Sequence, residues 1–226
     1  MDVLRRTKIY QSIRNKYKKL TFTRRNAILD QQMNSLSVSL SEKLLEGCRV
    51  FPSRKLMVAV FPKDAVIAEV GVAAGNFSVD ILDMALPRKF FLIDAWAMDK
   101  NSDYGEAGYA KVKARFRKEI DQEKIIINRG FSHEKLNDFE DDYFDWVYID
   151  AAHDYPSVKK DLDVSFRKVK NGGIVAGHDY LRWANRGMRF GVLEAVNCFC
   201  VQKELPFMGI SLDNDNNWSF AIRVSK

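Results

Sequence analysis

After residue 64, short apolar runs alternate with segments whose apolar residues recur at spacings of three and four. The first pattern is typical of buried strands and the second of amphipathic helices. Strands are predicted over residues 65–70, 90–93, 124–128, 144–149, 173–177, 206–212 and 218–224. Helices are predicted over about residues 76–85, 109–120, 158–169 and 190–201. The turn-forming run Asp-Asn-Asp-Asn-Asn at 213–217 predicts that the last two strands form a hairpin.

This alternation predicts the fold class. Strands and helices that alternate along a chain form a parallel sheet with helices on both faces. We therefore expect a doubly wound α/β domain with an antiparallel hairpin at one edge. In such sheets ligands bind at the carboxyl ends of the strands, near the point where the strand order reverses. The segments that directly follow strands are consequently where functional residues are expected.

The first 50 residues differ from the rest. Apolar residues recur at helical spacing from Ile9 to Leu20 and again from Leu29 to Leu44. The Phe51-Pro52 pair marks a break, because the residue before a proline disfavours helix. We expect a basic helical extension over residues 1–50, acting as a lid or an oligomerisation element, followed by the α/β domain over residues 51–226.

The charge is distributed unevenly. The 226 residues include 36 Lys and Arg against 30 Asp and Glu, which gives a net charge of +6. Such a balance suggests a nucleic acid or another anion as partner. Residues 1–25, however, carry nine basic side chains against Asp2, so this segment accounts for +8 and the remainder for −2. With 46% hydrophobic and 29% charged residues, a disordered chain is excluded. Nucleic acid is therefore not the expected partner of the α/β domain.

The cysteines and the hydropathy carry less information. Cys48, Cys198 and Cys200 are an odd number without CxxC spacing, which excludes a disulfide framework and a typical zinc site. A reducing, cytoplasmic setting is expected. No apolar run reaches the roughly 18 residues that a membrane span needs, so no membrane contact is expected.

A glycine-containing loop follows the first predicted strand of the α/β domain. The segment Glu69-Val70-Gly71-Val72-Ala73-Ala74-Gly75 allows a ligand to approach the backbone closely, and the free N–H groups of a helix follow it. It matches neither the dinucleotide fingerprint nor a phosphate-binding P-loop. Asp94 ends the next strand, where a carboxylate can accept both hydroxyls of a ribose. Together they favour an adenosine-containing ligand, the alternative being a tight turn without one.

Two further strand ends carry a second set of polar residues. Asp150 and His153 follow the strand that ends at residue 149, and His178 and Asp179 follow the strand that ends at residue 177. If these strands are neighbours, the two carboxylates converge, and they repel each other unless a proton or a cation lies between them. A divalent cation is thus one explanation. The alternative is that the acids cap helices and the histidines are structural.

These motifs resemble those of the class I S-adenosylmethionine-dependent methyltransferases. The resemblance is closest to the branch of macrocin O-methyltransferase-like and cephalosporin-hydroxylase-like proteins, whose Ile-Asp-Gly-x-His-x-Tyr strand end is followed by Gly-Gly and His-Asp. It covers residues 65–180, with Ala151 at a position where the branch usually has glycine. It implies a Rossmann-like, mostly parallel sheet of seven strands with an antiparallel last strand, and an enzyme that transfers a methyl group from S-adenosylmethionine.

The resemblance also implies roles for individual residues. Glu69 would lie beneath the loop and bond its backbone, Asp94 would hold the ribose, Trp96 would flank the adenine, and Ser132 would contact the adenine edge. The residues expected to line the methionine part of the cofactor are Gly71, Ala73 and Gly75.

Metal-dependent members of the family imply a site for magnesium at Asp150, His178 and Asp179, with His153 at the position of the base. Such a cation lowers the pKa of a bound hydroxyl, and imidazole is the usual base at neutral pH. A histidine ligand is unusual for magnesium, so His178 is either a supporting group or a ligand to a softer metal. The resemblance thus implies an O-methyltransferase acting on a sugar or a small secondary metabolite, with a small-molecule acceptor as its partner.

Other functions stay open at this point. Two histidines and a carboxylate are the ligand set of a non-haem iron oxygenase, although that chemistry needs no adenosine site. The basic N-terminal segment suggests an RNA methyltransferase, or helices through which a homo-oligomer forms. A non-catalytic binding protein on the same fold is the last alternative.

Overall fold

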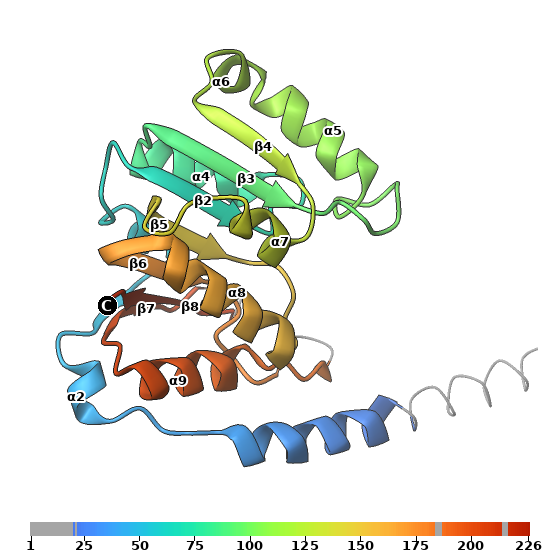
Figure 1. Cartoon of the computed structure of the whole chain (residues 1–226). Coiled ribbons are helices and arrows are strands. Elements are labelled where there is room, and N and C mark those ends of the chain that lie inside the picture. The colour runs from blue at the N-terminus through green and yellow to red at the C-terminus, as the bar shows by residue number, and fades with distance from the viewer. Residues whose placement is uncertain (1–19, 21, 184–186, 214–216) are drawn as a thin grey trace, which may run out of the picture.

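The computed structural model describes residues 20, 22–183, 187–213 and 217–226 (Figure 1). Its centre is an eight-stranded sheet with the order β1-β7-β8-β6-β5-β2-β3-β4. β8 is antiparallel to both of its neighbours, and all other neighbouring strands are parallel. The strands are β1 (Arg49–Phe51), β2 (Val66–Val70), β3 (Lys89–Asp94), β4 (Ile125–Arg129), β5 (Phe144–Ile149), β6 (Val169–Gly177), β7 (Phe207–Ser211) and β8 (Ser219–Arg223).

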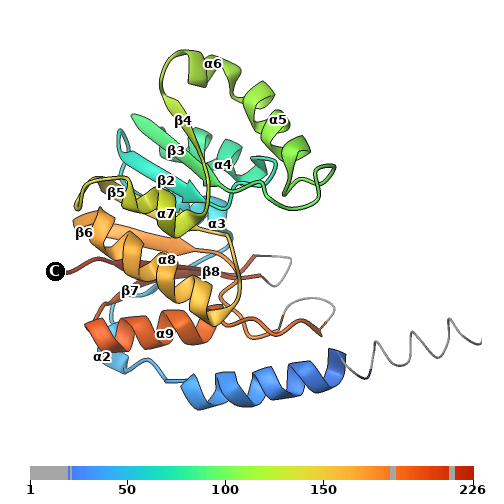
Figure 2. The same ribbon diagram turned by 45° about the vertical axis from the view of Figure 1, so that its right-hand side comes forward.

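Helices cover both faces of the sheet (Figures 1 and 2). One apolar core lies between the sheet and α7, α8 and α9, and the other lies between the sheet and α3, α4 and α5. Every residue of β2 is buried, as expected for a central parallel strand covered on both faces. The helices are α2 (Glu42–Leu45), α3 (Arg54–Val58), α4 (Asn76–Ala85), α5 (Glu106–Arg115), α6 (Arg117–Asp121), α7 (Ser132–Asn137), α8 (Tyr155–Lys168) and α9 (Val192–Lys203).

The predicted doubly wound α/β fold is confirmed, including the terminal antiparallel hairpin of β7 and β8. The expectation of seven strands is wrong, because β1 adds an eighth beside β7. This strand lies in the region expected to be helical. Three residues are too few for a periodic pattern, so their pairing with Gly209–Ser211 alone makes them a strand.

Two short helices, α3 and α7, have no counterpart in the predicted elements. The helix predicted over residues 109–120 begins earlier and is divided into α5 and α6 at Phe116, whose φ of −107° and ψ of 23° depart from helical values. Short helices bury few residues and carry little periodicity, which is why the pattern misses them.

A further helix over residues 22–36 runs beside α9 (Figures 1 and 2). Asn26 donates to the carbonyl of Gly187 at 2.5 Å, and Cys198 of α9 donates to the carbonyl of Leu36 at 3.0 Å. The helical pattern predicted from Ile9 to Leu20 lies, except for Leu20, outside the described residues, as do most of the basic side chains of residues 1–25. None of the helices in the described part of the chain has both the length and the apolar character needed to cross a bilayer.

Candidate functional site

The carboxyl ends of three parallel strands meet at Gly71. Its N–H donates to the carbonyl of Ile93 on β3 at 2.8 Å, and the N–H of Asp150 on β5 donates to the carbonyl of Val70 at 2.7 Å. Gly71 has a φ of +87°, and a Cβ built there would lie 2.0 Å from the carbonyl oxygen of Asp150. Glycine is therefore required both by the backbone conformation and by the close approach of the β5 end.

Asp94 organises this loop. Its Oδ2 accepts hydrogen bonds from the N–H groups of Val72 at 2.8 Å and Ala73 at 2.9 Å, and its Oδ1 accepts from Trp96 at 2.8 Å. A carboxylate offers about four lone-pair positions, so roughly one is left for a ligand hydroxyl. Asp94 lies where the sequence predicts it, but it serves the loop backbone first and has little capacity left for both hydroxyls of a ribose.

Trp96 is placed differently from the expectation that it flanks the adenine. Its side chain is buried behind the loop, where the indole N–H donates to the carbonyl of Ala73 at 2.8 Å and the ring packs against Tyr109 at a centroid distance of 5.1 Å. Ala73 itself has a φ of +50°, a conformation that few side chains adopt. Trp96 thus supports a strained position of the loop from behind.

A cavity of about 650 Å³ lies over these strand ends, in the size range of small-molecule sites. Of the expected site residues, Gly71, Ala73, Asp94, Ser132, Asp150 and His153 line it. The hydroxyl of Ser132 donates to Asp161 at 2.6 Å, and burial raises the pKa of Asp161. Cavity residues that the sequence analysis does not single out include Met98, Tyr104, Phe131, His133, Lys160 and Asp161.

Glu69 lies beneath the loop, fully enclosed. It was expected to bond the loop backbone, but its carboxylate instead accepts a hydrogen bond from the hydroxyl of Ser78 on α4. Burial raises the pKa of Glu69 to about 8, with the hydrogen bond from Ser78 opposing it. The carboxyl is therefore largely protonated at neutral pH.

This raised pKa predicts a pH dependence of stability. Between pH 4.5 and about pH 8, Glu69 keeps its proton in the folded protein but releases it in the unfolded chain, where its pKa is 4.5. The stabilisation present at low pH is therefore lost as the pH rises toward about 8. We expect the free energy of unfolding to fall more steeply between about pH 5 and pH 8 in the wild type than in Glu69→Gln. The extra loss amounts to about 1.4 kcal/mol for each unit by which the pKa of Glu69 differs between the folded and unfolded states. Urea unfolding at several pH values measures this, and identical profiles for the two proteins would contradict it.

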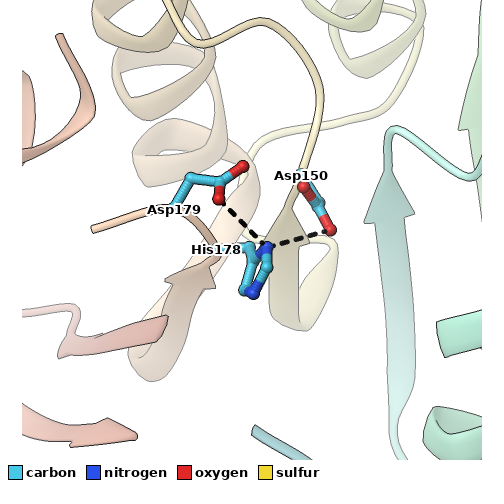
Figure 3. Close-up of side chains that lie close together, drawn as sticks. All are labelled: Asp150, His178 and Asp179. Carbon is cyan, nitrogen blue, oxygen red and sulfur yellow. Dashed lines mark ion pairs between the residues drawn. The ribbon is translucent and has the colours of Figure 1, made fainter. Parts of the chain in front are cut away.

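The second set of polar residues converges on the neighbouring ends of β5 and β6. One ligand atom from each of Asp150, His178 and Asp179 lies within 4.8 Å of the others. The Nδ1 atom of His178 lies between the carboxylates, 3.7 Å from Oδ2 of Asp150 and 3.5 Å from Oδ1 of Asp179 (Figure 3). Two buried atoms, Nε2 of His178 and Oδ1 of Asp179, have no hydrogen-bond partner among the described residues. The unpaired Oδ1 of Asp179, with Nδ1 of His178 and Oδ2 of Asp150 at this spacing, fits a divalent cation, whereas Nε2 is on the far side of the ring.

The charges of this cluster are strongly coupled. Burial favours the neutral form of Asp150, but the contact with His178 and then the charge of Arg54 outweigh burial and hold its pKa below the usual range. The pKa of His178 is raised by Asp150 against the opposing effect of burial, and burial raises the pKa of Asp179. Asp179 also has a φ of +57°, a left-handed conformation that aspartate tolerates better than most residues with a side chain.

His153 faces the same cluster. Its Nδ1 lies 3.3 Å from Oδ2 of Asp179, and its ring stacks on Phe190 at a centroid distance of 4.4 Å and an angle of 23°. The side chain is 36% exposed and lines the cavity. Asp179 and Phe190 therefore orient an imidazole that a ligand in the cavity can reach.

Arg54 is a site residue that the sequence analysis does not identify. It begins α3, and its Nη1 atom lies 3.1 Å from Oδ2 of Asp150, although 96 positions separate the two residues. Its guanidinium also lies over the ring of Phe77, 4.1 Å from the centroid. No sequence motif marks Arg54 as a site residue. It reaches Asp150 through the packing of α3 against α4, which the local sequence does not reveal.

Comparisons with known proteins agree with this geometry. Residues 68–180 match the methyltransferase domain family 24, while curated proteins gave no significant match. The fold is similar to that of a putative rRNA methylase from Clostridium thermocellum, with a TM-score of 0.57 and 12% identity over 76% of this chain and 93% of that chain. It is also similar to a SAM-dependent methyltransferase from Aquifex aeolicus, with a TM-score of 0.55 and 12% identity over 86% of this chain and 97% of that chain.

A third similar structure is the N-methyltransferase NodS from Bradyrhizobium japonicum WM9, with a TM-score of 0.54 and 13% identity over 76% of this chain and 93% of that chain. At such identities the likeness shows the fold, and the fold is that of the class I S-adenosylmethionine-dependent methyltransferases. The family match spans half of the chain. The chain belongs to the methyltransferase domain family 24, so it is a methyltransferase that uses S-adenosylmethionine.

Proposed function

We propose that the protein is a metal-assisted O-methyltransferase acting on a hydroxyl group of a sugar or a small secondary metabolite. The observation that carries this proposal is that one cavity is lined both by the glycine loop with Asp94 and by Asp150 with His153. A cofactor site and a site for activating an acceptor therefore open into the same space. The acceptor class rests on the resemblance to macrocin O-methyltransferase-like proteins.

The cofactor half of the cavity is built by the loop. S-adenosylmethionine supplies a methyl group that is already activated by its sulfonium, so the protein mainly has to align it. Gly71 and Ala73 present backbone to the cavity without bulky side chains, and hydrogen bonds with Asp94 and Trp96 hold Ala73 in its conformation. Ser132 and Asp161 add polar groups to the lining of the same cavity, and Ser132 is proposed to contact the adenine edge.

The acceptor half of the cavity is lined by Asp150 and His153, which contact the buried His178 and Asp179 behind them. Asp150, His178 and Asp179 would hold the divalent cation, magnesium or a softer metal, which lowers the pKa of a hydroxyl bound to it. His153 is placed to accept the proton of that hydroxyl, since its ring lines the cavity while Asp179 contacts Nδ1. The Asp179 contact leaves Nε2 as the atom that takes the proton.

A second candidate function is methylation of RNA. Two similar structures are described as an rRNA methylase and a tRNA methyltransferase, and residues 1–25 carry a charge of +8. Loss of RNA binding at raised salt would be the signature of such a phosphate-binding surface. The near-neutral remainder of the chain favours the small-molecule acceptor instead.

The proposal includes the organisation of the whole chain. Residues 1–50 would act as a lid or an oligomerisation element on a catalytic domain of residues 51–226. The end of this first segment belongs to β1, which pairs with β7 in the sheet. The three free cysteines support a reducing location such as the cytoplasm.

The cofactor assignment is tested by calorimetry with S-adenosylhomocysteine, the demethylated cofactor. We expect Asp94→Ala to weaken binding by about tenfold to a hundredfold, because two backbone N–H groups of the loop and that of Trp96 lose their acceptor together. Asp83→Ala, at an exposed acid of α4, serves as the matched control and should bind as the wild type does. Absence of binding by the wild type would overturn the proposed function, and unchanged affinity in Asp94→Ala would overturn the role of Asp94.

A further inference from the structure

Arg54 is held in place from three directions. Its backbone N–H donates to Oδ1 of Asp213 at 2.9 Å, its guanidinium lies over Phe77, and Nη1 lies 3.1 Å from Oδ2 of Asp150. The side chain is only 28% exposed. Such a guanidinium is a fixed part of the cluster and not a solvated surface charge.

The oxygen that Arg54 contacts is also the one that faces His178. Oδ2 of Asp150 lies 3.1 Å from Nη1 of Arg54 and 3.7 Å from Nδ1 of His178. A divalent cation bound to this oxygen would therefore lie close to a permanent positive charge. Like charges at a few ångströms in a partly buried site repel strongly, because little water screens them.

The other charges around Asp150 do not remove this conflict. Asp179 supplies a second carboxylate on the far side of His178, whereas the nearby Glu69 is largely protonated because burial raises its pKa to about 8. His153 faces Asp179 and adds no negative charge. Arg54 consequently neutralises much of the negative charge on which a cation would depend.

We propose that Arg54 is a built-in counter-cation of Asp150 that sets the affinity of the cluster for a divalent metal. A metal bound to Asp150 shares the charge of this carboxylate with the guanidinium as long as Arg54 stays at Oδ2. Phe77 offers the guanidinium an aromatic face on which it can remain when it moves away from Oδ2. The inference rests on the proposed metal site and adds a residue that controls how tightly the site is filled.

The test is a titration of the full chain with Mn²⁺ alone, in which electron paramagnetic resonance measures the concentration of free Mn²⁺. We expect Arg54→Met to bind Mn²⁺ about tenfold more tightly than the wild type, or better, because the competing charge is gone. Arg54→Lys, which keeps the charge, should stay close to the wild type. Lys55→Met is the matched control, since Lys55 pairs with Asp80 on the outside of the fold, and it should leave the affinity unchanged.

Arg54→Gln is measured in parallel and is expected to tighten binding as well, so the result does not depend on the folding of one variant. Asp150→Asn in the Arg54→Met background should remove the gain. Equal or weaker Mn²⁺ affinity in both neutral variants, with binding still dependent on Asp150, would overturn the role of Arg54 and leave the metal site standing. Binding that ignores Asp150→Asn, or no binding by any variant, would overturn both.

Discussion

Replacing Gly71 with alanine is expected to abolish measurable binding of S-adenosylhomocysteine and to destabilise the fold. The new Cβ would lie 2.0 Å from the carbonyl oxygen of Asp150 and 2.7 Å from Cα of Ala151. Both are backbone atoms, so no side chain can move aside to make room. The β5 end must then shift away from β2, which separates the loop from Asp150. Calorimetry with S-adenosylhomocysteine, together with thermal unfolding, measures both effects.

Gly172→Ala is the matched control for this substitution. Gly172 also has a positive φ, +78°, but nothing lies within 4 Å of the position of its Cβ. Its replacement should therefore lower stability only by the strain of the left-handed conformation, about 1–2 kcal/mol, and leave cofactor binding intact. If Gly71→Ala bound S-adenosylhomocysteine as tightly as Gly172→Ala does, the close contact between the β2 and β5 ends would not matter for the cofactor.

Replacing Glu194 with alanine is expected to cause the largest loss of stability. Glu194 forms a two-pronged ion pair with Arg189, with distances of 2.7 and 3.2 Å, and both side chains are fully buried. Arg182 contacts the same carboxylate at 3.3 Å, and Asp30 contacts Arg189 at 2.8 Å. Removing Glu194 leaves a buried guanidinium with only Asp30 as an acid partner among the described residues, and breaking a buried pair in this way costs about 3–5 kcal/mol.

This loss is measured by urea unfolding, with Glu204→Ala as control. Glu204 pairs with Lys43 at 3.5 Å, and both side chains are largely exposed, so its removal should leave stability nearly unchanged. Because Asp30 belongs to the helix over residues 22–36, the same network joins that helix to the segment before α9. A Glu194→Ala protein as stable as the Glu204→Ala protein would show that the buried network is not a main support of this junction.

Much of the fold follows from local pattern. The apolar runs of β2, β3, β5 and β6 and the spacing within α4 and α8 are visible in the chain, and β–α alternation then requires a parallel sheet. The same logic brings Asp150 and Asp179 together, since the residues that follow two neighbouring parallel strands lie at one edge of the sheet. The convergence of Asp150 with His178 and Asp179 was therefore predictable before any contact was known, whereas the position of His178 between the two acids was not.

The tertiary structure alone decided how some of these residues are used. Asp94 was predictable as an acid at a strand end, but two of its three backbone donors come from the glycine loop, whose conformation the pattern does not contain. Trp96 turns behind that loop and not into the cavity, because burying its ring against Tyr109 and bonding its N–H satisfies both parts of the side chain.

The sequence by itself thus determined the fold class, the glycine loop and the acids and histidines at the strand ends, because each depends on residues close together in the chain. The pairing of β1 with β7, the Arg54–Asp150 contact and the buried Arg189–Glu194 pair with Asp30 were decided by tertiary packing. Periodicity reports which side of an element is buried, but not which distant side chain it meets there. A charged side chain buried between two distant elements needs an oppositely charged or hydrogen-bonding partner, and only the assembled fold supplies one.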